Sequence, residues 1–311
     1  NVTSKDVIIE KSNSIETLSE ETLDQYQNES TNSPPMAVGR FDYLTQSYYM
    51  HVAQSFIPAK EILTKVEIKI GRNDSAIEDL TVAIRNDLTG NNLFEKNIDP
   101  AEVDTQNFSW LEVDIDNMFV DVGETYYLVV YTENITGNWY MWASNNDSAS
   151  YPYGEAWISM DNGSTWGNKS KAKNYNPKPR SLSKLDDTNI SIDLCFRTYG
   201  RDSTTFDIQF ALFGKNLTTT FTNIGDVNAT AVHFKVNVVG GVFNKIDEKT
   251  EAIYLPPLNP EGEIEAYTEF FGFGMVNITA EIHASNAPIV TKTARGFVFF
   301  SYIFVFQEIS I

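Results

Sequence analysis

The sequence predicts an all-β protein made of two β-sandwiches in series, an N-terminal jelly roll and a C-terminal Ig-like sandwich. Three observations support this prediction. Short segments rich in β-branched and aromatic residues recur after Phe41, and Pro, Gly, Asn and Asp turns separate them. Several segments alternate apolar and polar residues with a period of two, as half-buried antiparallel strands do. The length of 311 residues is sufficient for two domains of ordinary size.

Residues 1–38 are rich in Ser, Thr, Asn and Glu, and we expect them to form an N-terminal arm or linker. Val7 to Ile9 could pair as a short strand. Segment 14–26 predicts a weak helix with four apolar side chains near one face: Ile15, Leu18, Leu23 and Tyr26. A disordered linker is the alternative. Because residue 1 is Asn, the chain resembles a mature form that has lost a signal peptide, although a trimmed chain would look the same.

Residues 39–200 are expected to form the jelly roll, because about eight or nine short strands follow one another there. In one of them, Leu80, Val82 and Ile84 alternate with Thr81, Ala83 and Arg85. Residues 201–311 are expected to form the second sandwich. Its clearest strand places Val232, Phe234, Val236 and Val238 on one face and His233, Lys235 and Asn237 on the other.

The stretch FVFFSYIFVF, residues 297–306, looks like one closing strand that is apolar on both faces and carries no charge. Natural proteins normally protect such strands with charges, so it is either central or covered by a partner through β-augmentation. We therefore predict that it is enclosed on both faces and takes part in assembly through Phe297, Phe299, Phe300, Tyr302, Phe304 and Phe306.

The net charge of −19 argues against nucleic acid or anionic membrane as a partner. No run reaches the roughly 18 apolar residues that a membrane-spanning helix needs. The sequence contains twelve N-x-[S/T] glycan acceptors, whereas chance predicts about four or five. They are Asn1, Asn28, Asn73, Asn107, Asn134, Asn146, Asn162, Asn168, Asn189, Asn216, Asn228 and Asn277. Their density indicates an extracellular, N-glycosylated protein. Because Cys195 is the only cysteine, no intrachain disulfide can form, and this combination suggests an archaeal origin.

The stretch SMDNGSTW matches the Asp-box pattern through Ser159, Asp161, Gly163, Thr165 and Trp166. In the secreted β-proteins that it resembles, this motif is a hairpin turn rather than a catalytic centre, and a sialidase-like propeller would need several copies. We therefore expect a structural turn. Asn162 lies inside the box, and we expect its side chain to make none of the turn's bonds.

No active-site motif is recognisable, so we expect a protein that is not an enzyme. Loop carboxylates could hold Ca²⁺, with Asp147, Asp161, Asp186 and Asp187 as candidates, but solvated loop charge is the simpler interpretation and no other cofactor is expected. His51, His233 and His283 lie in expected strands without the spacing of a transition-metal site. Cys195 is expected to be a packed thiol.

Aromatic residues gather in the last third of the first sandwich: Trp139, Tyr140, Trp142, Tyr151, Tyr153, Trp157 and Trp166, together with Met141. They could be core and interface, or they could form a platform on which sugar rings stack.

Whole-strand patterns resemble known modules. The runs QSFIPAKEILTKVEIKI, LTVAIRNDLTG, DVGETYYLVVYTEN and YPYGEAWISMDNGSTW resemble a jelly-roll module of secreted and surface proteins of archaea and bacteria. The runs TNIGDVNATAVHFKVNVVGG and FFGFGMVNITAEI are similar to Ig-like, cell-adhesion-type modules. The resemblance implies a fold and a compartment more than an activity. The resulting prediction is a structural cell-surface glycoprotein that self-assembles as a filament, pilus or S-layer subunit, and the alternative is a polysaccharide-binding or adhesive module.

Overall fold

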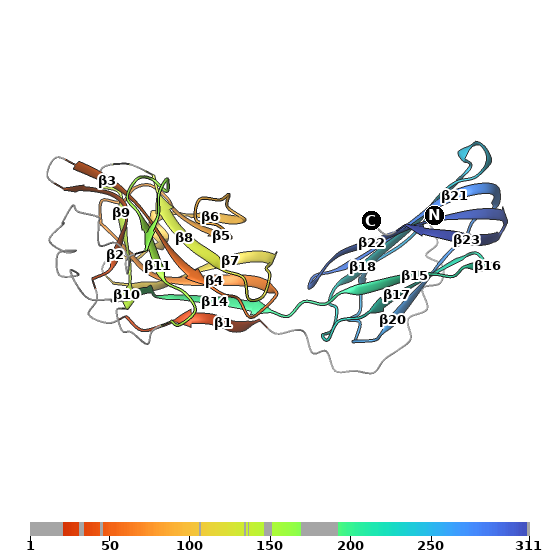
Figure 1. The fold of residues 1–311 in the computed structure, drawn as a ribbon, viewed down its shortest axis with the longest axis horizontal. Coiled ribbons are helices and arrows are strands. Elements are labelled where there is room, and N and C mark those ends of the chain that lie inside the picture. The colour runs from red at the N-terminus through yellow and green to blue at the C-terminus, as the bar shows by residue number, and fades with distance from the viewer. Residues whose placement is uncertain are drawn as a thin grey trace. The chain divides into compact units, whose positions relative to one another are not determined.

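The computed structural model describes residues 21–30, 34–43, 46–105, 107–133, 135, 137–145, 151–168 and 192–309. The fold of these residues is all-β with antiparallel sheets, as predicted. They belong to two compact units, one spanning residues 21–201 and the other containing residues 202–309 (Figure 1). The only helices among them are three-residue 3-10 turns, and none is long or apolar enough to cross a membrane.

The first unit is a sandwich of two sheets that share one strand, β3 (Gln46–Phe56). The first half of β3 pairs with one sheet and the second half with the other. The first sheet contains β1 (Thr22–Gln27), β2 (Met36–Tyr43), β4 (Ile62–Arg72), β7 (Ser109–Phe119), β9 (Trp139–Trp142) and β14 (Phe196–Arg201). The second contains β5 (Leu80–Arg85), β6 (Phe94–Ile98), β8 (Tyr126–Thr132), β11 (Ala156–Ser159) and β12 (Gly167–Asn168). Short elements complete the unit: η1 (Pro100–Glu102), β10 (Ser144–Asn145) and β13 (Asp193–Leu194).

The core of this unit lies between the two sheets and consists of the inward-facing residues of each strand. Val66, Ile68 and Ile70 of β4 are fully buried, and so are Leu80, Val82 and Ile84 of β5. Trp142 is also fully buried, and its indole N–H donates to the Cys195 carbonyl at 2.9 Å. A large ring can therefore be buried there without leaving an unpaired polar group.

The second unit packs a three-stranded sheet against a six-stranded sheet. The smaller sheet has the order β15 (Phe206–Phe210), β17 (Leu217–Asn223) and β20 (Glu263–Thr268). The larger has the order β16 (Phe213–Lys215), β23 (Tyr302–Ile309), β22 (Ala287–Phe300), β21 (Gly272–Ala284), β18 (Val232–Gly240) and β19 (Ile246–Leu255), with η3 (Val242–Asn244) between β18 and β19. Val232, Phe234, Val236 and Val238 of β18 face the core, because the strand alternates as the sequence predicts.

The structure corrects the expected helix over residues 14–26 in the part that is described. Residues 22–27 form strand β1, which pairs antiparallel with β14 and belongs to the sheet of the first unit rather than to an arm. Leu23 and Tyr26 are exposed, so these side chains do not form an apolar helix face. Pairing with an existing strand satisfies the backbone hydrogen bonds directly, whereas a weak helix would need to bury a stripe that this segment lacks.

The closing stretch FVFFSYIFVF is also different from the expected single strand. It is the end of a hairpin, in which β22 stops at Phe300 and β23 starts at Tyr302, with Phe299 paired to Tyr302. Phe300 takes a left-handed backbone conformation with φ of 57° to make the turn. Because the chain reverses there, the stretch supplies two neighbouring strands to the sheet.

Candidate binding surfaces

The Asp-box residues 159–166 form one compact turn after β11. The Asp161 carboxylate accepts hydrogen bonds from the Thr165 amide at 2.8 Å and the Thr165 hydroxyl at 2.6 Å. The Ser159 hydroxyl donates to Asp161 at 2.7 Å and accepts from the Gly163 amide at 2.8 Å. Desolvation acts to raise the pKa of Asp161, but these hydrogen bonds outweigh it and hold that pKa below its usual value. The carboxylate is therefore committed to the turn.

The Asn162 side chain makes a contact that the sequence did not predict. Its Oδ1 lies 3.1 Å from Nε2 of His51 on β3, and its backbone N–H donates to the Tyr49 carbonyl. His51 is 8% exposed, and this burial is the main cause that lowers its pKa from 6.5 to about 4. Both contacts run from Asn162 to β3 and neither is one of the turn's own bonds, so they add a link to the expected turn and do not contradict it. The turn and β3 are joined by a neutral imidazole.

The outer face of the second sheet of this unit carries a layer of aromatic side chains. Its floor is a row of small residues paired across the strands: Ala53 on β3, Val129 on β8 and Ala83 on β5, all fully buried. Four partly exposed rings pack on that floor, and we call them the aromatic surface: Tyr127, Tyr131, Trp157 and Trp166. The burial of Ala83 differs from the expected polar outer face of β5, because these rings cover it.

The rings of the aromatic surface are held by specific neighbours. Tyr131 stacks on His51 with ring centroids 4.8 Å apart, and Trp157 meets Tyr127 edge to face at 6.4 Å. The Trp166 indole N–H donates to the Gly163 carbonyl at 3.1 Å, so the Asp-box turn fixes this ring. In contrast, the Trp157 indole nitrogen is buried and has no hydrogen-bond partner among the described residues.

Polar groups border the surface. The Arg85 guanidinium lies 5.9 Å from the Tyr131 ring centroid and donates to the Asn92 side chain at 2.6 Å. The Asn92 amide in turn donates to the Tyr131 hydroxyl at 3.1 Å and to Glu95 at 2.6 Å. Rings with hydrogen-bonding groups at their edge can hold a ligand that has both apolar C–H faces and hydroxyl groups.

The other aromatic residues singled out in the sequence do not join this surface. Tyr140, Trp142 and Tyr151 are buried, with the pKa of Tyr140 and of Tyr151 raised to about 12 mainly by burial. Trp139 and Met141 alternate with the buried residues of β9 and are partly exposed. Tyr153 is 62% exposed and contacts the Tyr151 ring.

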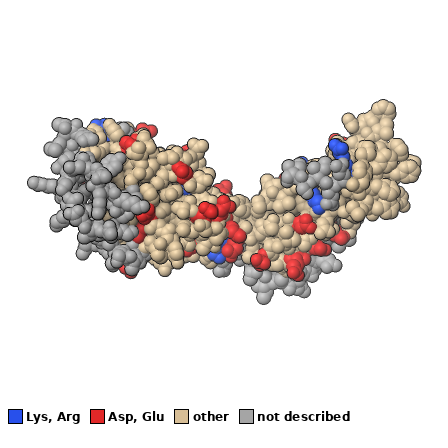
Figure 2. Space-filling model, viewed as in Figure 1, with Lys and Arg blue, Asp and Glu red and all other residues tan. Residues whose placement is uncertain are grey.

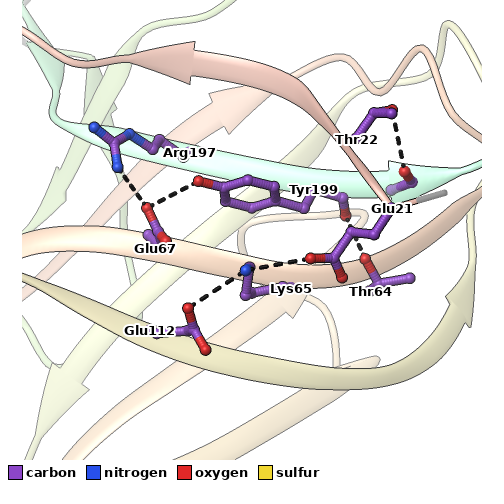
Figure 3. Close-up of polar contacts among 9 residues, drawn as sticks. Glu21, Thr22, Thr64, Lys65, Glu67, Glu112, Arg197 and Tyr199 are labelled. Atoms are coloured by element: carbon purple, nitrogen blue, oxygen red, sulfur yellow. Dashed lines mark hydrogen bonds and ion pairs between the residues drawn. The ribbon is translucent and has the colours of Figure 1, made fainter.

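The outer face of the first sheet carries ion pairs instead of an aromatic layer (Figure 3). Lys65 lies between Glu21 at 3.2 Å and Glu112 at 3.3 Å, and Arg197 pairs with Glu67 at 2.8 Å. The Tyr199 hydroxyl donates to the same Glu67 at 3.1 Å. These ion pairs are partly buried, with the Glu67 and Arg197 side chains 12% and 27% exposed, and each of these charges already has a partner.

The outer face of the larger sheet in the second unit has a different character. Inward-facing Val298, Ile303 and Val305 are buried in the core, whereas the residues that alternate with them are aromatic and point outward. We define the apolar face as Phe213, Phe271, Phe273, Met275, Phe297, Phe299, Phe300, Tyr302, Phe304 and Phe306; all but the partly exposed Phe297 are at least 45% exposed. The inner side of the closing stretch is thus covered by its own sandwich, whereas among the described residues its outer side is uncovered. The predicted enclosure of that outer side by a neighbouring domain or an adjacent subunit stays a prediction.

The three histidines lie in strands, and the sequence did not reveal that two of them meet. His233 and His283 are paired across β18 and β21 with ring centroids 4.7 Å apart. Register between strands fifty residues apart brings them together, which spacing along the chain cannot show. No group of three or more His, Cys, Asp or Glu side chains placed to bind a metal occurs among the described residues. Of the four Ca²⁺ candidates, Asp147, Asp186 and Asp187 lie outside them.

Cys195 is buried, and burial raises the pKa of its thiol to about 11. Of the glycan acceptors, Asn1, Asn134, Asn146 and Asn189 lie outside the described residues, and Asn168 belongs to β12. The remaining acceptors are all partly or fully exposed: Asn28, Asn73, Asn107, Asn162, Asn216, Asn228 and Asn277.

No protein-family model and no curated protein matches the chain. Solved structures that share some similarity include a β-glucuronidase of Bacteroides uniformis, at 10% identity and a TM-score of 0.21, over 81% of this chain and 27% of that one. A β-D-glucuronidase of Dictyoglomus thermophilum matches at 13% identity and a TM-score of 0.19, over 88% of this chain and 43% of that one. The Endo-D glycoside hydrolase domain of Streptococcus pneumoniae R6 matches at 11% identity and a TM-score of 0.19, over 85% of this chain and 36% of that one. The chain spans less than half the length of these proteins, and scores this low support no inference about activity.

Proposed function

We propose that the first unit is a carbohydrate-binding module of an extracellular or cell-surface protein, and that its ligand lies on the aromatic surface. The observation that carries the proposal is the placement of four partly exposed rings on one sheet face, over a floor of small residues. A pyranose ring has a face of C–H groups that packs on an aromatic ring, while its hydroxyl groups point to the sides. Arg85, Asn92 and Glu95 lie at the border, where such hydroxyl groups would be.

Tyr127, Trp157 and Trp166 supply the stacking area in this proposal, and each is held by its neighbours before any ligand arrives. Two-χ aromatic side chains lose little conformational entropy on binding, so a preformed set of rings gives more affinity than a mobile one. The unpaired Trp157 indole nitrogen adds a donor that a sugar hydroxyl could satisfy after a small movement of the ring.

The test is binding of the full chain to a panel of soluble plant, bacterial and animal polysaccharides by affinity electrophoresis and calorimetry. Trp157→Ala should weaken binding by on the order of tenfold or more, because one stacking ring is lost. Tyr153→Ala is the matched control, since Tyr153 is an exposed ring of the same unit outside the surface. An absence of binding across the panel, or equal binding by Trp157→Ala and the wild type, would refute the proposal.

We further propose that the module binds its ligand without a chemical step and that the protein is N-glycosylated outside the cytoplasm. The partial or full exposure of the seven acceptors named above supports glycosylation, because a glycan needs access to water. Release of reducing ends from a bound polysaccharide would contradict the first part. The archaeal or bacterial surface module suggested by the sequence patterns stays a hypothesis about origin.

Assembly of copies, as in a filament or surface layer, is the second candidate, and the apolar face favours it. A filament needs two different complementary surfaces, whereas a single self-complementary surface gives a closed pair. Among the described residues of the second unit, the apolar face gathers most of the exposed aromatic side chains, so it is one surface of this kind rather than two. Pairwise association is therefore the form of assembly that it supports.

A further inference from the structure

The apolar face is a continuous array of side chains on four adjacent strands. In one row, Phe213, Phe304, Phe297 and Met275 are paired across β16, β23, β22 and β21. In the next row, Lys215, Tyr302, Phe299 and Phe273 are paired across β16, β23, β22 and β21, so one exposed cation lies at the edge of the face on β16. Directly paired residues of antiparallel strands lie on the same side of a sheet, so both rows face outward together.

Ring contacts join these rows into one surface. Phe273 of the second row lies 5.1 Å from Phe297 of the first, and Tyr302 of the second row lies 6.0 Å from Phe213 of the first, as centroid distances. In the view of Figure 2, the far end of this unit, where Figure 1 labels β16, β21 and β23, shows neither acidic nor basic side chains. The described strands place one charge at the edge of the face, that of Lys215 on β16, although the chain as a whole has a net charge of −19.

The area of the face decides what it can be. A fully exposed aromatic side chain offers roughly 200 Å², so ten side chains at about half exposure offer on the order of 1,000 Å². The largest apolar patch of an ordinary monomer measures roughly 300 to 600 Å². A stable protein interface buries about 800 Å² on each partner. The apolar face therefore exceeds what a monomer leaves to water and matches one side of an interface.

We propose that the apolar face of β16, β21, β22 and β23 is an interface between two copies of this chain, paired face to face around a twofold axis. A second copy offers an aromatic surface of equal area, with Lys215 as a cation at its β16 edge. A lipid surface fits less well, because interfacial membrane binding is usually supported by basic residues, and this acidic chain would be repelled by anionic lipids. Arg295, exposed and paired with Asn277, marks the polar border of the face.

The proposal goes beyond carbohydrate binding and is tested separately from it. Sedimentation equilibrium and light scattering of the full chain should give twice the 35.1 kDa polypeptide mass, plus any glycan, and dissociation on dilution. Phe304→Asp, in the middle of the face, should raise the dimer dissociation constant by on the order of 100-fold, because it buries an unpaired carboxylate. Its circular dichroism should be unchanged, since the side chain points away from the core.

Ile289→Asp is the matched control, because Ile289 is 65% exposed on the same sheet but lies near the opposite end of β22. It should dimerise as the wild type does. A wild type that remains monomeric up to about 100 µM overturns the proposal, including one that binds neutral or anionic vesicles through this face. A folded Phe304→Asp variant that dimerises as tightly as the wild type also overturns it, because the contact would then lie elsewhere.

Discussion

Burial of His51 should make the first unit sensitive to mild acid. Because the pKa of this imidazole is lowered from 6.5 to about 4 in the folded state, unfolding takes up a proton between those two values. The contribution of neutral His51 to the free energy of unfolding should therefore be fully present above about pH 6.5. It should be lost as the pH decreases towards 4. A shift of this size corresponds to about 3 kcal/mol, at about 1.4 kcal/mol for each pH unit.

The assay compares the wild type with His51→Gln by urea unfolding at several pH values between 7.5 and 4. The carboxylates titrate in both proteins, so the difference between the two curves isolates His51. The variant should lose stability at neutral pH, since stacking on Tyr131 is lost. Between pH 7.5 and 4, however, its free energy of unfolding should change by about 3 kcal/mol less than that of the wild type. An NMR titration reads the pKa of the ring directly. A His51 resonance that titrates near pH 6.5, or parallel stability curves, would refute this reasoning.

Three further predictions concern the Asp-box turn, the first sheet and N-glycosylation. Trp166→Ala should destabilise the first unit by about 2 kcal/mol in urea unfolding, because the ring is only partly buried but loses its bond to Gly163; no measurable change would mean that the ring does not support the turn. Gly39→Ala should cost about 3 kcal/mol, since φ at Gly39 is 104° and a Cβ there would collide with the Asn138 carbonyl and the Thr132 methyl; a melting temperature equal to that of the wild type would contradict this. Intact-mass spectrometry of protein from its native source should exceed 35.1 kDa by several glycans, and an unmodified mass would remove the argument for an extracellular location.

Local patterns predicted most of the strands, because a period of two is visible in a single segment. Strand β18 alternates as expected, with Val236 facing the core, and β5 does so except at Ala83, which the aromatic surface buries. The Asp-box turn depends on residues within eight positions of one another, so its chemistry is also readable from the sequence. These are the features for which contact partners lie close along the chain.

The features that the sequence missed all depend on distant partners. His51 and Asn162 are separated by 111 positions, and no local pattern links them. The hairpin turn at Phe300 lacks the Gly or Asn that normally marks a left-handed position, so the stretch looked like one strand. The aromatic surface was missed in part for the same reason, because Tyr127 and Trp157 meet only through the register of β3, β8 and β11.

The strand β3 gives the first unit a mechanical property that separate sheets would not have. Because one continuous segment is hydrogen-bonded into both layers, the layers cannot separate without breaking the pairs between β3 and at least one of them. Amide protons of Met50 and Val52, which flank the point where β3 passes from one sheet to the other, should therefore exchange with solvent only through opening of the whole unit. A pulling force applied to either layer would likewise be carried along this strand, so the unit should yield in one step rather than layer by layer.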